Sequence, residues 1–534
     1  MSLSIFWPHN QVLFRGKSIS HAWADEMALQ GVWDIVQEPE GADFNFFISD
    51  SQLREDQLGK RPSICYFWGY PPWRLLDRAF QERAQRQLEL MSRCTRILVP
   101  SPTTLYQLMD FGLQGQICLP GVDARTLSMR AAPASFKHDL LFISRIDAPE
   151  KNLGMLLEAL TLIDPSPSLL VVGPGDARPY QQFATANGLN VAFAELTDQE
   201  KVGAIQQTRM LVHPSEYEGF GLPPMESLFL STPVIAMSTP HMRWLLEEDA
   251  YYFGSVEGLA RTIGDVAANE AAAREKARKG QARVAKAFTL ERAGRDLWAH
   301  LHQTSKDFWG GKLRENPNDP ELVQRCYQEE HKRNWAYGQV TFDIDRSAPW
   351  RFDPTWARHW RAEAFIRELK QAGAQRILDL GCGAVYPTIL ARAGFTVEGM
   401  DVSEEALRQA TEIAAKWKVA DKVTVRQGMA QHLPYGDGEF SAVLMGEILE
   451  HVPDPANVLA EALRVTKPGG RVIASTPIGS HHMDVFHIAS PEGGWNDEMI
   501  GKLLDPYGTA VLKVEKIAED GTDPSCYLMV VEKR

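Results

Sequence analysis

The stretch "SEYEGFGLPPMES", residues 215–227, follows one apolar run, "MLVHP", and precedes another, "VIAM". Short apolar runs bounded by glycine and proline, with a helical pattern between them, are typical of buried strands in a parallel sheet. Pro223 and Pro224 suit the first turn of that helix, where a missing N–H breaks no hydrogen bond. The stretch therefore predicts a strand, a loop that carries Glu218 and a helix whose first turn carries Glu226.

This loop and helix start have the chemistry of a site for phosphate and sugar. A helix N-terminus has free N–H groups and a partial positive charge, which suit a diphosphate. Gly219 and Gly221 let a ligand approach the backbone, and the Glu218 carboxylate can accept hydrogen bonds from two neighbouring hydroxyls. A nucleotide sugar has both groups. A glycine loop followed by a favourable first-turn acid is the alternative explanation for the two glutamates taken alone.

The same alternation of apolar runs and helical patterns continues on both sides, which predicts parallel sheets covered by helices. It is interrupted at the polar, turn-rich "GGKLRENPNDPE", residues 310–321, a linker candidate, and resumes at "QRILDLGCG", residues 375–383. We therefore expect an α/β protein with two Rossmann-like domains, a linker and a third α/β domain. The expected boundaries are 1–134, 135–305, 306–345 and 346–534.

Composition narrows the class of protein. The chain has 534 residues, a formal net charge of -13 and an isoelectric point near 5.6. An acidic total disfavours a nucleic-acid partner, because phosphate binding needs a basic surface. The 6 cysteines lack the spacing of a metal site, and we expect reduced thiols. Without a signal-peptide pattern or an apolar run near ~18 residues, we expect a cytoplasmic protein, and a peripheral contact with the inner face of a membrane is compatible with this.

The string "PSEYEGFGLPPME" resembles the E-x7-E motif of retaining glycosyltransferase family 4, and the resemblance covers about residues 1–305. It implies a GT-B fold of two Rossmann-like domains. It also implies that Glu218 contacts the hydroxyls of the donor sugar and that Glu226 contacts the ribose of the nucleotide. The residues that follow Glu218 are expected to border the nucleotide sugar: Gly219, Phe220, Gly221 and Leu222.

The same resemblance places an arginine and a lysine on the phosphates of the donor. The segment "SRIDAPEKNLGMLLEAL" supplies Arg145 and Lys151, with a spacing one residue longer than the commoner family pattern. Fixed cations stabilise the charge that builds up on a departing nucleoside diphosphate. Arg145 and Lys151 are therefore expected to be catalytic together with Glu218 and Glu226. Gly173, in "LVVGPG", is expected near the nucleotide, although a plain tight turn explains it equally well.

The acceptor side of this first site has weaker signals. The segment "LFRGKSISHAW" offers Gly16 and Lys17 for the diphosphate and His21 for the reacting sugar, although a histidine on a helix face is the commoner explanation. In "CYFWGYPPW", Trp68 and Gly69 stand where relatives often have an acid or a histidine. The aromatic side chains of this segment either stack on sugar rings or pack internally, so the acceptor stays open.

A second motif, "RILDLGCGAVYPTILARAGFTVEGMDVS", reads as strand, glycine turn, helix and second strand. Asp379, Gly381 and Gly383 crowd the first turn, and Asp401 ends the second strand. An acid at that position, about 20 residues after the glycines, is placed to bind a ribose diol. Val385 stands where a dinucleotide site would have its third glycine, which argues against such a site.

This motif resembles the class I S-adenosylmethionine-dependent methyltransferases, and the resemblance covers about residues 346–534. It implies a third Rossmann-like domain that binds S-adenosyl-L-methionine, with Met429 and Ala430 beside the adenine. The segments "LKVEKIA" and "CYLMVVEK" are expected to form a terminal hairpin that makes the sheet mixed. The Asn/Asp-Pro-Pro-aromatic stretch of amine methyltransferases is lacking, which favours methylation of an oxygen.

The segment "GEILEH" raises the question of a metal. Glu447, Glu450 and His451 share one face if the segment is helical, and with His481 or His482 they could hold a divalent ion such as Mg. The segment resembles ubiquinone-pathway and small-RNA methyltransferases that use a metal. The alternative, which we favour, is a metal-free site in which His451 is a general base or structural.

The sequence as a whole predicts a bifunctional cytoplasmic enzyme. We expect retaining glycosyl transfer from a nucleotide-sugar donor to a glycan or lipid-linked glycan, and methylation of a hydroxyl on a related glycan in surface-polysaccharide assembly. One alternative is a nucleic-acid or small-molecule methyltransferase with a degenerate, non-catalytic sugar-binding domain. Another is a binding or scaffold protein in which one domain is inactive.

Overall fold

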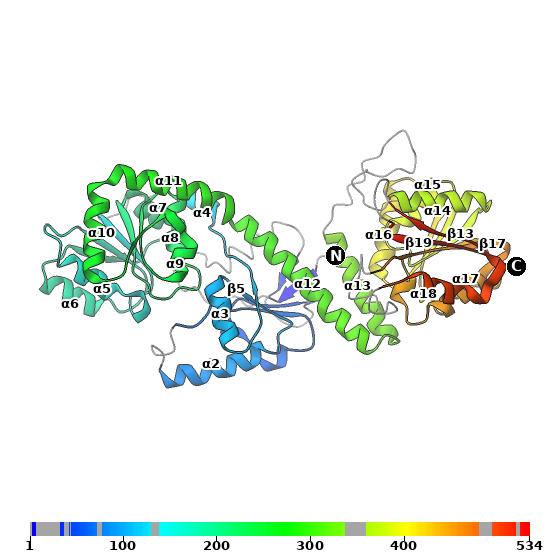
Figure 1. The fold of residues 1–534 in the computed structure, drawn as a ribbon, viewed down its shortest axis with the longest axis horizontal. Helices are drawn as coiled ribbons and strands as arrows, with labels where there is room; N and C mark the ends of the chain where they lie inside the picture. The colour runs from blue at the N-terminus through cyan, green and yellow to red at the C-terminus, as the bar shows by residue number, and fades with distance from the viewer. Residues whose placement is uncertain are drawn as a thin grey trace. The chain divides into compact units, whose positions relative to one another are not determined.

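The computed structural model describes residues 3–6, 33–36, 42, 44–71, 77–129, 138–336, 359–479, 494–518 and 524–534. These residues divide into two compact units, one of Ser4–Ser305 and one formed mainly by Lys306–Arg534. Figure 1 shows both units as sheets with helices on their faces. Among the described residues, no helix combines the length and the apolar character needed to cross a membrane.

The first sheet lies in the first unit and has the strand order β2-β1-β3-β4-β5-β6. The pairs from β1 through β6 are parallel. Its strands are β1 (Leu3–Phe6), β2 (Trp33–Val36), β3 (Phe44–Phe47), β4 (Ser63–Tyr66), β5 (Arg96–Val99) and β6 (Gln116–Ile117). The helices α2 (Arg78–Met91) and α3 (Pro102–Asp110) belong to the same lobe.

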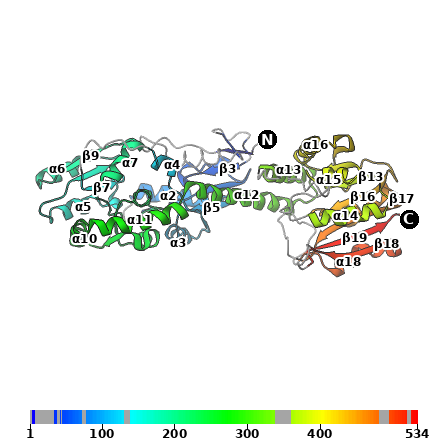
Figure 2. The same ribbon diagram turned by 90° about the horizontal axis from the view of Figure 1, so that it is seen from above.

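The second sheet is parallel throughout, in the order β12-β11-β10-β7-β8-β9. Its strands are β7 (Leu140–Ile143), β8 (Leu169–Val172), β9 (Val191–Ala194), β10 (Met210–His213), β11 (Val234–Met237) and β12 (Tyr251–Phe253). Its helices are α4 (Ala124–Leu127), α5 (Leu153–Leu160), α6 (Arg178–Ala186), α7 (Asp198–Gln207), α8 (Leu222–Phe229), α9 (Pro240–Leu246), α10 (Val256–Ala268) and α11 (Glu270–Ala287). Figure 2 shows α5 and α10 on one side of this sheet and α7 on the other.

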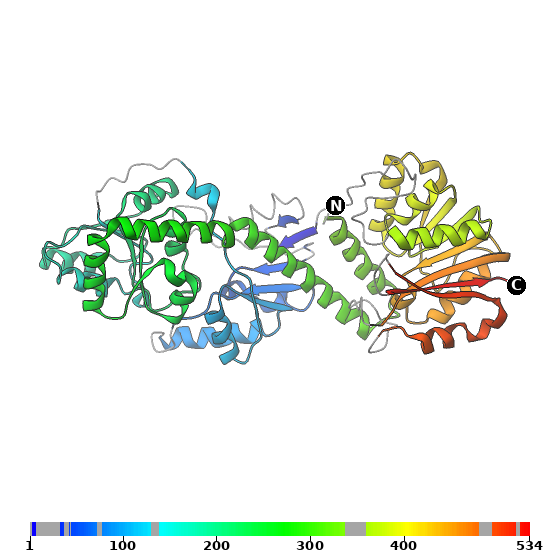
Figure 3. The ribbon, with the colours of Figure 1, turned by 45° about the horizontal axis from the view of Figure 1, so that its top comes forward.

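The third sheet lies in the second unit and has the order β15-β14-β13-β16-β17-β19-β18. Its strands are β13 (Arg376–Leu380), β14 (Thr396–Asp401), β15 (Val423–Gln427), β16 (Phe440–Gly446), β17 (Thr466–Pro477), β18 (Val511–Ile517) and β19 (Cys526–Glu532). The first five strands in that order are parallel, and β19 is antiparallel to both β17 and β18. The red hairpin strand β19 lies beside the orange strand β17 in Figure 3.

Helices cover both faces of this third sheet. They are α14 (His359–Gln371), α15 (Tyr386–Arg392), α16 (Glu404–Lys416), α17 (Pro455–Val465) and α18 (Asp497–Leu504). In Figure 1, α14 and α15 lie along one face and α17 and α18 along the other. The expected α/β class, the parallel sheets and the mixed third sheet are therefore confirmed.

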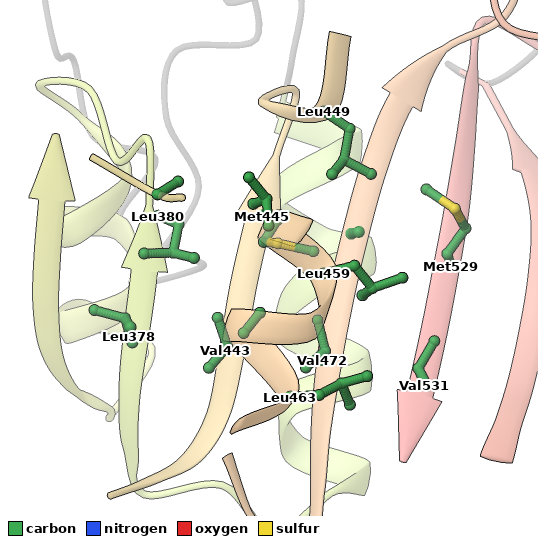
Figure 4. Close-up of a cluster of buried hydrophobic side chains, with 14 of the residues drawn as sticks. Leu378, Leu380, Val443, Met445, Leu449, Leu459, Leu463, Val472, Met529 and Val531 are labelled. Carbon is green, nitrogen blue, oxygen red and sulfur yellow. The ribbon is translucent and has the colours of Figure 1, made fainter. Parts of the chain in front are cut away.

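Strands buried on both faces explain the unbroken apolar runs of the sequence. Successive side chains of a strand point to opposite faces. In β16, Val443 and Met445 belong to the core beside α17 and α18, drawn in Figure 4. Their neighbours Ala442 and Leu444 belong to the core beside α14 and α15. Both cores are buried, so each face needs its own apolar set.

The stretch expected as a linker, 306–345, is helical over its described part. α12 covers Leu290–Glu315 and α13 covers Pro320–Ala336. Asp319 begins α13 by accepting the backbone N–H of Glu321 at 3.0 Å, and proline suits the first helical position. Gly310 and Gly311, which belong to the stretch expected as a linker, lie inside α12, where glycine is tolerated at a cost of about 1 kcal/mol.

The two lobes of the first unit are joined at a seam between residues far apart in the sequence. The Val122 N–H donates to the Phe288 carbonyl at 2.8 Å, and the Leu290 N–H donates to the Val122 carbonyl at 3.1 Å. A Cβ on Gly121 would lie 2.3 Å from the carbonyl carbon of Thr289. Only a glycine lets the two chain segments come this close.

We predict that Gly121→Ala destabilises the first unit by about 2–3 kcal/mol, because a backbone contact cannot yield as a flexible side chain can. The measurement is the unfolding transition of the full chain by differential scanning calorimetry. The matched control is Gly264→Ala, in the exposed interior of α10, where an added Cβ meets nothing within 4 Å. That control should stabilise by about 0.5–1 kcal/mol, and equal effects of the two variants would contradict the seam.

Candidate active sites

Glu218 and Lys151 come together at the carboxyl edge of the second sheet. Glu218 lies in the loop between β10 and α8, and Lys151 ends the turn between β7 and α5. β7 and β10 are neighbouring parallel strands, so the loops at their carboxyl ends meet. Lys151 Nζ donates to Glu218 Oε1 at 2.9 Å and to the Tyr217 carbonyl oxygen at 3.1 Å. Two residues singled out from separate motifs thus form one ion pair.

The Glu218 carboxyl group is kept ionised by its partners. Burial alone would raise its pKa, but Lys151, followed by His213, outweighs burial and holds the pKa of Glu218 well below its usual range. His213 Nε2 lies 3.0 Å from Glu218 Oε1. An ionised carboxylate only accepts hydrogen bonds, so Glu218 can receive sugar hydroxyls but cannot act as an acid at neutral pH.

Arg145 lies in the same β7–α5 turn. One guanidinium nitrogen contacts Glu150 Oε1 at 3.0 Å, and 55% of the Arg145 side chain is exposed whereas Glu150 is buried. A guanidinium has five N–H donors. The ion pair with Glu150 therefore orients Arg145 and still allows it to contact an anion at this edge.

Glu226 forms a second ion pair that the sequence did not predict. It lies in α8, and Lys201 Nζ, from α7, donates to its Oε1 at 3.0 Å. Burial would lower the pKa of Lys201, but Glu226 raises it above its ordinary value, so the lysine is charged. Lys201 belongs to no motif, and only the fold brings α7 beside α8. A cation therefore neighbours the acid that we expect on the ribose.

Packing and backbone conformation require glycine at two positions of this site, in addition to the expected contacts with a ligand. A Cβ on Gly173, where φ is +147°, would lie 1.9 Å from the Ser144 carbonyl oxygen. Gly221 has φ 105° at the start of α8, a conformation that favours glycine. The Phe220 side chain is buried in the core and Leu222 packs against it. Any ligand contact of Phe220 would therefore come from its backbone.

The loop after β4 touches the loop of Glu218. The Tyr217 hydroxyl lies 3.3 Å from the Trp68 carbonyl oxygen and 3.4 Å from Gln107 Oε1, and its single proton can be donated to either acceptor. A Cβ on Gly69 would lie 1.7 Å from that hydroxyl, and one on Gly219 would lie 2.6 Å from the Trp68 carbonyl oxygen. Tyr217 and Gln107 were missed because their partners are distant in sequence.

Three further residues expected at the first site, Gly16, Lys17 and His21, lie outside the described residues. The Trp68 side chain packs against the core of the second sheet, and its Nε1 donates to the Ile48 carbonyl at 2.7 Å. The sequence left two roles open for the aromatic residues of 65–73, stacking on sugar rings or internal packing. The Trp68 side chain packs internally.

The glycine turn of the third sheet is closed by two acids. Asp401 ends β14 and accepts the Gly383 N–H at 3.0 Å and the Ser403 N–H at 2.9 Å. Asp379, in β13, is buried, and its Oδ2 has no hydrogen-bond partner. Burial, and then Asp401, raises the pKa of Asp379 well above its ordinary value. A buried acceptor without a partner suits a cationic or N–H-bearing ligand, as S-adenosylmethionine would be.

The other residues expected beside this cofactor flank the same edge. Gly381 has φ 64°, and a Cβ there would lie 2.9 Å from Ile448 Cδ1. The loop after β15 is tied to the end of β14, because the Gly428 N–H donates to the Asp401 carbonyl at 3.1 Å. Met429 packs on an apolar cluster of α12 and α13, and Ala430 belongs to the sheet core. The geometry fits the expected cofactor.

Glu447, Glu450 and His451 do not share a helix face, contrary to the condition set for a metal site. Only Leu449–His451 forms a helical turn, and Glu447 precedes it with φ 58°. Arg361 contacts Glu447 Oε2 at 2.8 Å. Burial, then Glu447, raises the pKa of Glu450 well above its ordinary value. The Arg361 guanidinium thus already occupies one Glu447 oxygen where a cation would otherwise bind.

In the described part of the chain, no group of three or more His, Cys, Asp and Glu residues could hold a metal ion. His481 and His482 lie outside the described residues. His451 Nε2 lies 3.9 Å from Glu450 Oε1, and the Thr476 hydroxyl donates to Glu450 Oε2 at 3.1 Å. The described residues therefore give the expected metal no support.

Comparison with known proteins places a family in each unit. Residues 137–269 match the model described as glycosyl transferases group 1, and residues 378–474 match the methyltransferase domain. The demethylmenaquinone methyltransferase of Lactiplantibacillus plantarum is 39% identical over 120 residues, 22% of this chain and 50% of that protein. The match thus spans half the length of that relative. The ubiquinone biosynthesis O-methyltransferase of Pseudomonas aeruginosa is 28% identical over 232 residues, 36% of this chain and 98% of that protein.

Among solved structures, Anabaena HepE in complex with UDP and glucose has a TM-score of 0.46 at 14% identity, and covers 56% of this chain and 100% of its own. Sucrose-phosphate synthase from Thermosynechococcus elongatus has a TM-score of 0.43 at 18% identity, over 49% of this chain and 74% of its own. The chain contains a group 1 glycosyltransferase domain and a methyltransferase domain. The first unit contains two six-stranded sheets that follow one another in the chain, and the second of them is parallel throughout.

We predict that Gly69→Ala costs more stability than Gly59→Ala by about 1–3 kcal/mol. Both glycines have left-handed φ, 84° and 79°, so both variants have the backbone strain of an L-residue. Only at position 69 does the new Cβ meet the Tyr217 hydroxyl; at position 59 it meets nothing within 4 Å. Urea unfolding measures the difference, and equal losses would show that the Tyr217 contact is easily displaced.

We predict that Asp379→Asn stabilises the ligand-free second unit by about 1 kcal/mol at pH 8. The folded-state pKa of Asp379 is raised, so the unfolded state ionises first, and stability is lost as pH rises from the unfolded pKa, ~3.9, through the folded value. The gain from asparagine should therefore be larger at pH 8 than at pH 5. Calorimetric unfolding at both pH values measures it, with the exposed Asp421→Asn as control. If Asp379→Asn lowered the stability of the second unit at pH 8, burial of Asp379 would not be the cause of its raised pKa.

Proposed function

We propose that this chain is a bifunctional transferase, in which the first unit transfers a sugar from a nucleotide donor with retention and the second unit methylates a hydroxyl oxygen. The observation that supports it best is the ion pair of Lys151 and Glu218, which joins two separately identified motifs at the carboxyl edge of a parallel sheet. That edge is where open α/β sheets bind their ligands.

In the proposed glycosyl transfer, Glu218 accepts hydrogen bonds from the donor sugar and Glu226 from the ribose. Arg145 and Lys151 contact the diphosphate, where a fixed positive charge stabilises the departing group more in the transition state than in the ground state. Lys151 can serve both Glu218 and a phosphate, since an ammonium has three donors. A phosphate oxygen of the donor takes the proton of the acceptor hydroxyl, so no enzyme nucleophile is needed.

In the proposed methyl transfer, S-adenosylmethionine supplies the activated methyl group. Asp401 binds the ribose hydroxyls, and the unpartnered oxygen of Asp379 accepts an N–H of the amino-acid portion. His451 takes the proton of the acceptor hydroxyl as a general base. Methylation at oxygen agrees with the O-methyltransferase named among the relatives.

The proposed acceptor of both steps is a glycan or a lipid-linked glycan. Two transferases on one chain suit consecutive steps on one product, as in surface-polysaccharide assembly. The proposed location is the cytoplasm, at the inner face of a membrane when the acceptor is lipid-linked. The acidic net charge of -13 supports a glycan rather than a nucleic-acid acceptor.

We predict that Glu218→Gln and Asp401→Asn each remove one activity of the full chain. Glu218→Gln should weaken nucleotide-sugar binding by roughly 10- to 100-fold, because hydrogen bonds to a charged acceptor are lost, and should leave S-adenosylhomocysteine binding unchanged. Asp401→Asn should do the reverse. The measurement is isothermal titration calorimetry, after a thermal-shift screen of nucleotide sugars has identified the donor.

Each variant is the control for the other, and unfolding curves identify any variant that fails to fold. If both variants lose both ligands, the two sites are not independent. If Glu218→Gln retains donor affinity and sugar transfer, the assignment of the first site is wrong.

A further inference from the structure

The helical segment before the methyltransferase domain packs directly on its expected cofactor edge. Trp309 and Leu313 of α12 and Val323 and Cys326 of α13 form a buried apolar cluster, with Val402 and Met429 packed against it. Val402 follows Asp401, and Met429 is an expected adenine neighbour. This segment lies outside residues 378–474, which match the methyltransferase family model.

A side chain of α13 reaches the loop that holds Asp401. Gln328 Oε1 accepts the backbone N–H of Glu405 at 3.1 Å and the Ser403 hydroxyl at 3.4 Å. Ser403 and Glu405 are buried, and Ser403 is the N-cap of α16. The Ser403 N–H in turn donates to Asp401 Oδ1 at 2.9 Å. A continuous set of hydrogen bonds therefore runs from Gln328 to the acid expected on the ribose.

The same helix also touches the loop after β16. The Tyr327 hydroxyl donates to the His451 carbonyl at 3.5 Å, and the two rings pack edge to face with centroids 5.7 Å apart. β14 and β16 lie on either side of β13 in the sheet. α13 thus contacts two loops at the edge where the cofactor is expected, and it restrains both of them through adjacent residues.

We propose that Gln328 is a positioning residue of the methyltransferase site, which fixes the Ser403–Glu405 turn and through it the Asp401 carboxylate toward the ribose of S-adenosylmethionine. The inference rests on the proposed methyltransferase function. Without this acceptor, the Glu405 N–H loses its side-chain partner at a buried position, and the turn is free to rotate the Ser403 N–H away from Asp401. Ordering the carboxylate again on ligand binding then weakens affinity.

The experiment compares three variants of the full chain. Gln328→Met keeps the length of the side chain and removes the acceptor, whereas Gln328→Glu keeps an acceptor oxygen at the N-terminus of α16, where a negative charge is favourable. Gln324→Met, one turn earlier in α13, is the matched control. The probe is S-adenosylhomocysteine, measured by isothermal titration calorimetry, with amide hydrogen exchange at Ser403 and Glu405 as a second readout.

We expect Gln328→Met to weaken S-adenosylhomocysteine binding about three- to tenfold, the effect of one or two hydrogen bonds, and to speed amide exchange at Ser403 and Glu405. Gln328→Glu should restore most of the affinity, and Gln324→Met should bind as the unaltered chain does. With a methyl acceptor in hand, the loss should appear in the KM for S-adenosylmethionine more than in kcat.

Binding of S-adenosylhomocysteine by the unaltered chain separates a failure of the proposed function from a failure of the positioning role. If it does not bind S-adenosylhomocysteine, the proposed methyltransferase function fails. If it binds and Gln328→Met binds equally well with unchanged amide exchange, the positioning role is overturned. If Gln328→Met unfolds at a lower temperature, the S-adenosylhomocysteine affinity of Gln328→Glu is compared with that of Gln324→Met instead. A folded Gln328→Glu that binds S-adenosylhomocysteine tenfold more weakly than Gln324→Met also overturns the proposal.

Discussion

A parallel strand must be followed by a connection that returns across the sheet, so its carboxyl end always opens into a loop. This constraint positions four of the candidate residues of the two sites. Glu218 follows β10, Lys151 follows β7, Asp401 ends β14 and Glu447 follows β16. The strands are short and buried on both faces, which fixes their registers. The charged residues at these strand ends are therefore held by the core beneath them.

The carboxyl groups of the two sites have opposite pKa shifts. Glu218 is half-buried beside Lys151, which lowers its pKa, whereas burial raises the pKa of Asp379 and Glu450, each of which has another acid as its next influence. Desolvation acts in the same direction on all three carboxyls, and the sign of the nearest charge decides the outcome. The first site thus provides a fixed negative acceptor beside a cation. The second provides buried carboxyls whose pKa values are raised.

The strand pattern could be predicted from sequence because two-sided burial leaves an unbroken apolar run, as in "RILDL" and "VLMG". The contact between Lys151 and Glu218 could be expected because both follow strands of one sheet. The helices of residues 306–336 were missed because Gly310, Gly311 and a polar turn resemble a linker. The contacts of Lys201, Tyr217 and Gln328 have no local pattern, since each of these side chains meets a residue brought near only by the fold. The prediction that Glu447, Glu450 and His451 share one helix face was wrong, because the backbone at Glu447 is left-handed and the helical turn begins only after it.

The order of strands in the third sheet has a consequence for how the chain assembles. β18 is synthesised before β19, yet among the described strands its only partner is β19, which inserts between it and β17. Until β19 arrives, the edge of β17 that carries Val472 and Ile473 has no partner, and exposed apolar edges are prone to intermolecular pairing. Closing this edge depends on contacts between segments far apart in the chain, which form slowly. During synthesis, the edge of β17 is therefore open to intermolecular pairing until residues 526–532 are available.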